Sequence, residues 1–201
     1  MMWLREPSES ALRYTVQKQA RGEFSYAEVG ATRNEEAPKG YAVARERIQL
    51  GEGEQAWEKA RWAVTHWKMF QLDWVKVCWS YQRIEPGSVV GVLVFSYWLW
   101  SLNPAKIVYV VDEEEPVRRY GFGYGTLEGH MAQGEEQFLI EMLEDGTVWY
   151  ELYSFSKPRH KLARWFSPLA KRVQRRFARQ SLQAMFDAVN KPPPKVRIRR
   201  R

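Results

Sequence analysis

Cysteine is nearly absent from this sequence, whose 201 residues include one, Cys78, together with three histidines. One cysteine cannot form an internal disulfide, and the scattered histidines include no closely spaced pair of the kind that binds zinc. The most apolar run, residues 89–102, is shorter than the ~20 residues of a membrane-spanning helix. No apolar leader follows Met1. We therefore expect a cytoplasmic protein with no metal or other cofactor.

Acidic residues are scarce at one end of the chain. Residues 157–201 contain fifteen Lys or Arg and one acidic residue, Asp187, which is a formal charge of +14. The preceding residues carry −7, so the net charge of +7 describes an acidic body with a basic C-terminal segment. Partners of the two parts have to be considered separately, because a mean charge hides this asymmetry.

Apolar and aromatic residues are plentiful, at 45% and 14% of the chain, and ten of them are Trp. This composition excludes disordered and fibrous classes and indicates one globular domain with a sizeable core. Strand-like runs rich in Val, Ile, Tyr, Phe and Trp occupy residues 41–50, 74–81, 88–98, 105–112, 117–127, 135–143 and 147–156. Helical spacing of apolar residues predicts a helix over residues 54–70 and a long amphipathic helix over residues 169–190.

The order of these elements predicts an α+β protein with a helix-grip fold. Six consecutive strands joined by short turns require antiparallel pairing, and the long C-terminal helix is the element available to cover the sheet. We expect a curved antiparallel sheet of about seven strands wrapped on that helix, within residues 41–190. Residues 1–40 are expected to be an extension that packs on this domain, and residues 191–201 a mobile basic tail. A monomer or weak homodimer is expected.

Two strands have informative alternation. In residues 135–143, Glu136 shares the apolar face with Phe138, whereas Glu135 is predicted to face water. Residues 117–127 have an aromatic face that includes Tyr124 and a second face with Gly121, Gly123 and Gly125. Alternate glycines mark a bend or a close approach by backbone or ligand, so a hollow beneath the helix and simple coiling of the sheet both remain open.

Glu136 and His130 form a possible acid–base pair. A carboxyl group among apolar side chains has a raised pKa unless it is paired, and His130 lies in the turn that precedes its strand. Acid–base chemistry requires the two side chains to converge within about 3 Å or through one water. The simpler and favoured interpretation is a buried carboxylate that accepts hydrogen bonds from backbone N–H groups of the loop.

The exposed face of the last helix is basic and carries Lys171, Arg172, Arg175 and Arg179. Together with the tail, these residues suit an anionic membrane surface, and less well nucleic acid. A solvated cationic face that balances the acidic body needs no partner and is the favoured interpretation.

The sequence YGTLEGH at residues 124–130, followed by GEEQF at 134–138, resembles an uncharacterised family of bacterial and plant proteins classed as a domain of unknown function. The resemblance covers roughly residues 24–186 and includes the segment WKMF at 67–70. The family is similar to the START-like, or Bet v 1-like, superfamily. This resemblance implies a helix-grip fold with a cavity under the C-terminal helix that binds lipids, hormones or aromatic molecules, or that supports cyclase-type chemistry.

We therefore favour a non-enzymatic protein that binds an apolar or aromatic small molecule or a lipid under the C-terminal helix. Cyclase-type acid–base chemistry by Glu136 and His130, and binding to an anionic surface or nucleic acid, are the alternatives. The residues expected to contact the ligand are Trp98, Tyr109, Tyr124, His130, Glu136, Phe138 and Trp149.

Overall fold

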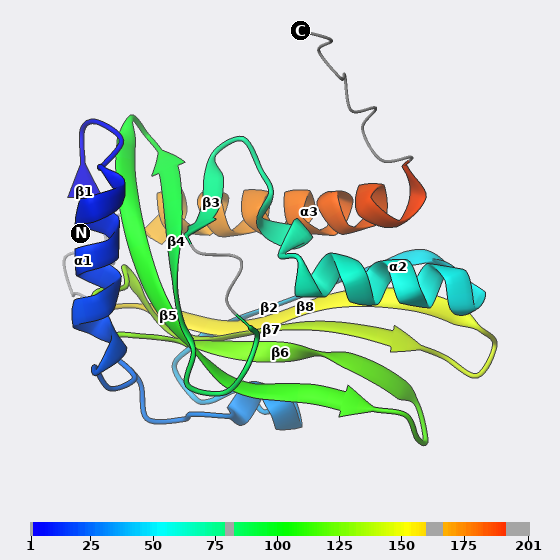
Figure 1. Cartoon of the computed structure of the whole chain (residues 1–201). Helices are drawn as coiled ribbons and strands as arrows, with labels where there is room; N and C mark the ends of the chain where they lie inside the picture. The colour runs from blue at the N-terminus through cyan, green and yellow to red at the C-terminus, as the bar shows by residue number, and fades with distance from the viewer. Residues whose placement is uncertain (1, 79–82, 160–166, 192–201) are drawn as a thin grey trace, which may run out of the picture.

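The structure is a computed structural model that describes residues 2–78, 83–159 and 167–191 (Figure 1). Its strands are β1 (Met2–Trp3), β2 (Ala42–Glu52), β3 (Val75–Cys78), β4 (Val89–Ser96), β5 (Leu99–Glu113), β6 (Arg118–Thr126), β7 (Ala132–Met142) and β8 (Thr147–Pro158). Its helices are α1 (Glu9–Ala20), η1 (Ala31–Asn34), α2 (Gly53–Thr65), η2 (Lys68–Phe70) and α3 (Ser167–Asn190), of which η1 and η2 are 3-10 helices. The expected tail lies outside the described residues, apart from Lys191.

The described strands form one antiparallel sheet in the order β2-β8-β7-β6-β5-β4-β3, with β1 paired to β5. Strands β4 to β8 are neighbours in sequence and in space, because the short turns between them allow only antiparallel pairing. Strand β2 pairs with β8, which places the first long strand beside the last one. The α+β helix-grip fold predicted from the sequence is confirmed by this sheet and its C-terminal helix.

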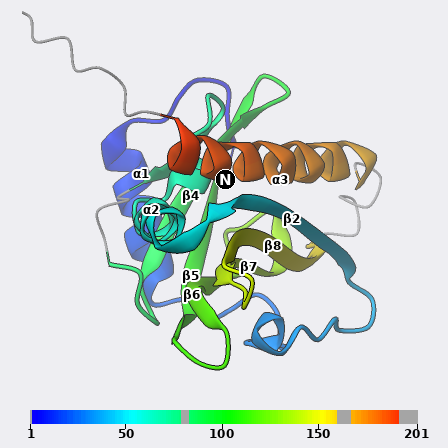
Figure 2. The same ribbon diagram turned by 90° about the vertical axis from the view of Figure 1, so that its right-hand side faces the viewer.

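Helices α2 and α3 lie side by side on one face of the sheet, called the inner face below (Figures 1 and 2). Helix α3 is amphipathic, and its buried residues Ala178, Leu182, Met185 and Val189 recur at helical spacing toward the sheet. Helix α2 likewise turns Trp57, which has no exposed surface, toward the core. These two apolar stripes and the inner face of the sheet form the main hydrophobic core.

Side chains of β7 alternate between the two faces of the sheet as expected. Phe138 and Ile140 have no exposed surface and lie in the main core, and they stand opposite Phe122 and Tyr120 of β6. Glu136 stands opposite Tyr124 and so shares this face. A single residue step moves a side chain to the other face of a strand, which sends Glu135 to the outer face.

The outer face is covered by N-terminal residues. Helix α1 packs on β4 and β5, where Leu12 and Val16 join Leu93 and Leu102 in a second apolar cluster. Farther along the chain, Phe24 forms a β-bridge with Leu127 at the end of β6. Both faces of the sheet are therefore covered, which accounts for the apolar residues on both sides of β4.

Aromatic side chains explain two of the alternate glycines of β6, Gly123 and Gly125. A Cβ atom added at Gly123 would lie 2.5 Å from the ring of Tyr109, and one at Gly125 would overlap the hydroxyl group of Tyr26. The glycines face the outer side of the sheet, opposite α3, so the expected hollow beneath the helix is not what they accommodate. Gly123 and Gly125 permit close approach by aromatic rings, whereas Gly121 permits close approach by the backbone of Phe138.

Strand β5 is longer than the sequence pattern indicated. Residues 88–98 and 105–112 were expected to be two separate strands, with residues 99–104 between them. Instead, β4 ends at Ser96, the chain turns at Tyr97 and Trp98, and β5 continues through Pro104, which pairs with Gly91. The prediction was wrong here because Pro104 is accommodated within the strand.

Candidate functional site

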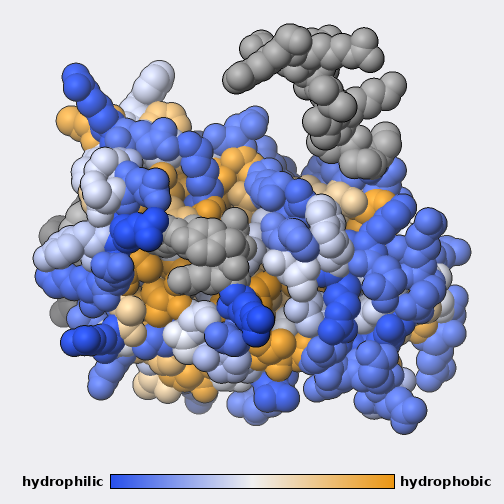
Figure 3. Space-filling model, viewed as in Figure 1, coloured by the Kyte–Doolittle hydropathy of each residue, from blue (hydrophilic) through white to orange (hydrophobic). Residues whose placement is uncertain are grey.

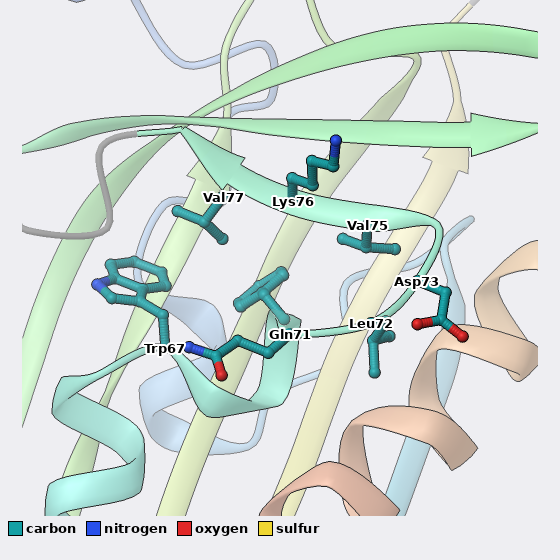
Figure 4. A pocket seen from close by; sticks show the side chains of 8 residues that line it. Trp67, Gln71, Leu72, Asp73, Val75, Lys76 and Val77 are labelled. Carbon is teal, nitrogen blue, oxygen red and sulfur yellow. The ribbon is translucent and has the colours of Figure 1, made fainter. Parts of the chain in front are cut away.

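A pocket of about 390 Å³ opens between η2 and β3. Figure 4 shows Trp67 and Gln71 on one side and Val75 and Val77 on the other. Its complete lining is Trp67, Phe70, Gln71, Leu72, Asp73, Val75, Lys76 and Val77. Five of these eight residues are apolar, the side chains of Gln71 and Asp73 are polar, and Lys76 directs its side chain away from Trp67 and Gln71 (Figure 4). The chain reaches this position because α2 ends at Thr65 and Trp67, with a positive φ of 55°, then turns the chain into η2.

Phe70 forms the wall between this pocket and the space under α3. Its ring centroid lies 5.2 Å from those of both Phe138 and Phe177. Phe138 also contacts Phe122, at 5.2 Å, and Phe122 contacts Trp67, at 4.9 Å. These rings occupy the space between the sheet and α3 in which the sequence suggested a ligand. The pocket therefore lies beside α3 and Phe70 and not directly beneath the helix.

Tyr124 and Glu136 lie behind Phe70 on the inner face. The ring centroid of Tyr124 is 6.1 Å from that of Phe70, and the Tyr124 hydroxyl donates a hydrogen bond of 2.7 Å to Oε2 of Glu136. Burial raises the pKa of Glu136 to about 7, although the hydrogen bond from Tyr124 opposes the rise. The Glu136 side chain nevertheless retains some contact with water. It is a carboxyl group that changes protonation near neutral pH.

The expected ligand residues do not come together in one place. Tyr124, Glu136 and Phe138 share the inner face, whereas Tyr109 and Trp149 lie on the outer face. Tyr109 is hydrogen-bonded to Thr32 of η1 at 2.6 Å, and the guanidinium of Arg47 lies 4.7 Å from the Trp149 ring centroid. The expectation that Tyr109 and Trp149 contact the same ligand as Tyr124 was wrong, because the pattern did not establish which face these strands turn inward.

Trp98 does not line the pocket between η2 and β3. It occupies the β4–β5 turn and is 85% exposed. The prediction that Trp98 contacts a ligand on the inner face was wrong because it assumes one continuous strand over residues 88–98, in which Trp98 would face inward. The structure ends that strand two residues earlier.

His130 and Glu136 are not joined by a hydrogen bond. The Nδ1 atom of His130 instead accepts a hydrogen bond of 3.0 Å from the backbone N–H of Ala132, which closes the β6–β7 turn. Burial lowers the pKa of His130 to about 4, so the ring is neutral at pH 7. The direct acid–base contact that an enzyme mechanism required is therefore absent between these two described residues.

The buried carboxylate that holds a loop is Glu135 and not Glu136. Glu135 is 2% exposed and accepts hydrogen bonds from the Tyr26 hydroxyl at 2.5 Å, the Gly30 N–H at 2.7 Å and the Thr32 N–H at 3.0 Å. The Thr32 hydroxyl donates a further hydrogen bond to it. The prediction that Glu135 faces water was wrong because residues 24–36 cover this face, and alternation alone cannot reveal that cover.

The basic residues expected on the last helix are exposed. Lys171, Arg172, Arg175 and Arg179 all lie on the solvent side of α3, and none forms an ion pair with an acidic side chain within the described residues. The described residues also contain no group of three or more His, Cys, Asp or Glu side chains placed to hold a metal ion. Among the described helices, none is long and apolar enough to cross a membrane. A cytoplasmic location stays a prediction.

Trp67 and Phe70 were missed as pocket residues. Their helical spacing with the buried face of α2 indicated core positions, and both are indeed 1% exposed. A signal was nevertheless present, since WKMF at 67–70 was one of the segments that carry the family resemblance. The change from α2 to η2 within this segment turns these two residues toward β3.

Known proteins match nearly the whole chain. A family model described as "Domain of unknown function (DUF1990)" matches residues 25–184. A "UPF0548 protein" of Deinococcus radiodurans is 38% identical over 199 residues, which cover 94% of this chain and 98% of the relative. A "UPF0548 protein" of Dictyostelium discoideum is 33% identical over 207 residues, covering 94% and 96% of the two chains. Among solved structures, Ara h 8.0201 has a TM-score of 0.49 and 13% identity, covering 75% of this chain and 98% of that one.

Proposed function

Since this chain belongs to the family described as Domain of unknown function (DUF1990), a description that names no activity, we propose from its own residues that it binds an apolar or aromatic small molecule or a lipid. The family resemblance identified from the sequence is confirmed. The proposed ligand lies in the pocket between η2 and β3.

The pocket's size and lining are the observation that carries this proposal. A volume of about 390 Å³ falls within the range of roughly 300–1,000 Å³ that is usual for small-molecule sites. Its apolar residues would remove the ligand's apolar surface from water, at roughly 25 cal/mol per Å². Leu72 and Val77 are the partly exposed apolar residues of the lining, and the buried rings of Trp67 and Phe70 lie behind them.

The polar residues of the pocket provide orientation. Gln71 and Asp73 stand beside the apolar side chains, whereas the Lys76 ammonium lies on the other face of β3, 2.7 Å from Glu6. A ligand with one polar end would place that end toward Gln71 and Asp73 and its apolar part toward Phe70. Small-molecule sites usually have a few polar groups among apolar walls.

Binding without chemical conversion is the function that these contacts support. His130 is held by backbone groups, and Tyr124 and Phe138 are almost fully buried behind Phe70. A ligand in the pocket therefore touches Phe70 before either of them. Neither His130 nor Glu136 is placed among the residues that line the pocket.

Fluorescence titration with 8-anilinonaphthalene-1-sulfonate, an aromatic dye that brightens in apolar surroundings, tests the proposal. Val77→Trp places a large ring in the pocket and is expected to weaken dye binding by about tenfold or more. Val43→Trp, at a 49% exposed position on β2, is the matched control and should bind the dye as the wild type does. Thermal unfolding of both variants checks that they are folded. Equal dye affinity in Val77→Trp and the wild type would contradict the proposal.

A further inference from the structure

The β4–β5 turn has a backbone that its residues disfavour. The two-residue turn consists of Tyr97 and Trp98, with φ values of 49° and 66°. Turns with positive φ at both central residues favour Asn-Gly, because side chains larger than those of Gly and Asn are strained there. Two bulky aromatic residues are therefore poor choices for forming this hairpin, and another role has to account for them.

The aromatic side chains of this turn are exposed. Tyr97 is 52% exposed and Trp98 85% exposed, and neither makes a ring contact or side-chain hydrogen bond with another described residue. Strand β1 pairs with β5 just beyond the turn and carries Met2, 55% exposed, and Leu4 follows it at 82%. These four side chains, called the apolar corner below, gather exposed apolar surface at one end of the molecule.

The basic face of α3 lies on the same side of the molecule as the apolar corner. Figures 1 and 2 agree in placing the β4–β5 turn above α3, on the side of the helix that faces away from the sheet. Contacts join the two: the Arg176 guanidinium lies 4.4 Å from the Trp74 ring centroid, and the Trp74 carbonyl accepts a 2.8 Å hydrogen bond from Phe95 N–H. Phe95 is two residues before the turn.

Charge strengthens this side of the molecule as a binding surface for anions. Five exposed cations, Lys171, Arg172, Arg175, Arg176 and Arg179, have no acidic partner within the described residues. The acidic side chains near the apolar corner are already paired, Glu6 with Lys76 at 2.7 Å and Glu9 with Arg13 at 2.8 Å. Figure 3 shows that hydrophilic side chains dominate the remaining surface in that view, with apolar ones gathered in a few places.

We propose that the apolar corner and the basic face of α3 together dock this protein on an anionic phospholipid bilayer. Trp and Tyr side chains prefer the boundary between headgroups and acyl chains, and aliphatic side chains such as Leu4 and Met2 extend into it. The cations of α3 are attracted by anionic headgroups. Nucleic acid also attracts cations, but it offers nothing to the aliphatic side chains of the corner.

Co-sedimentation of the full chain with vesicles tests the proposal, using phosphatidylcholine alone and phosphatidylcholine mixed with phosphatidylserine. The wild type is expected to bind the mixed vesicles, and less strongly as salt is raised. The double variant Tyr97→Asn, Trp98→Gly keeps the turn type while removing both rings. It should bind about tenfold more weakly, equivalent to about 1.4 kcal/mol. Tyr14→Ser, which removes a 70% exposed ring on α1, should bind as the wild type does.

A second variant examines the charge. Arg172→Gln with Arg175→Gln should weaken binding to the mixed vesicles and make it less sensitive to salt. The proposal is overturned if the Asn-Gly variant binds the mixed vesicles as strongly as the wild type. It is equally overturned if the wild type binds a DNA duplex but not these vesicles. Dye binding in the η2–β3 pocket is independent of either result, so the two proposals fail separately.

Discussion

The hydroxyl of Tyr124 and the carboxylate of Glu136 are paired across β6 and β7 at 2.7 Å on the inner face of the sheet. Burial raises the pKa of Glu136 to about 7 from its ordinary value of 4.5, and the hydrogen bond from Tyr124 opposes that rise. This pair introduces a titrating group into the aromatic core beside the proposed ligand pocket. The fold is therefore expected to respond to pH near neutrality.

Glu136→Gln should remove that response. A carboxyl group whose pKa is higher in the folded state binds its proton more tightly there, so its contribution to stability is lost as the pH rises from about 4.5 to 7. After allowance for the partial exposure of Glu136, the variant should gain about 1–2 kcal/mol over the wild type at pH 8 and little at pH 4. Urea unfolding at both pH values measures this, and an equal difference at the two would contradict it.

Glu135→Ala should destabilise the protein far more than the same change at Glu136. Removing the Glu135 carboxylate leaves the N–H groups of Gly30 and Thr32 and the Tyr26 hydroxyl without their buried acceptor. A loss of about 3 kcal/mol or more is expected, because unpaired buried donors are costly. Urea unfolding measures the loss, and hydrogen exchange should show faster exchange at Gly30 and Thr32. Glu136→Ala is the control, with its smaller loss.

Gly123→Ala should be destabilising because of Tyr109. The added methyl group would lie 2.5 Å from the Tyr109 ring, so the ring or the strand has to move, at about 1–3 kcal/mol. In a Tyr109→Val background the same change should cost much less, because the ring is gone. A double-mutant cycle of unfolding free energies measures this coupling. Additive effects of the two changes would show that the ring is not the reason for the glycine.

The Asn-Gly variant of the β4–β5 turn should be more stable than the wild type. Tyr97 and Trp98 both occupy the left-handed region, which costs bulky residues roughly 1–2 kcal/mol each. A rise in unfolding free energy of about 1–3 kcal/mol is expected, less any packing that the exposed rings provide. Thermal unfolding measures it, and a clear fall in the melting temperature would contradict the view that the turn is strained.

The fold was largely predictable from the sequence because its signals are local. Strand β7 was expected at residues 135–143 and runs Ala132–Met142, and the C-terminal helix was expected at residues 169–190 and runs Ser167–Asn190. Alternation in β7 also placed Glu136 and Phe138 correctly on the inner face. The spacing of apolar residues and the residue types in the turns determine the elements and the inward side chains of β7. Neither needs knowledge of distant residues.

The site was less predictable because it depends on contacts between distant residues. Glu135 was expected to face water, and the residues that cover it lie about one hundred positions earlier in the chain. Trp67 and Phe70 became pocket residues because the chain turns into η2 at Trp67 with a positive φ, for which the local sequence holds no glycine signal. Trp98 was misplaced by an unrecognised turn of two aromatic residues.

A crystal structure of the full chain with bound 8-anilinonaphthalene-1-sulfonate tests the central claim, that the η2–β3 pocket binds an apolar or aromatic molecule, most directly. The account predicts that the dye's aromatic rings lie in this pocket against Leu72 and Val77, with its sulfonate toward the Gln71 amide. Dye bound elsewhere on the protein, with this pocket unoccupied, would contradict it.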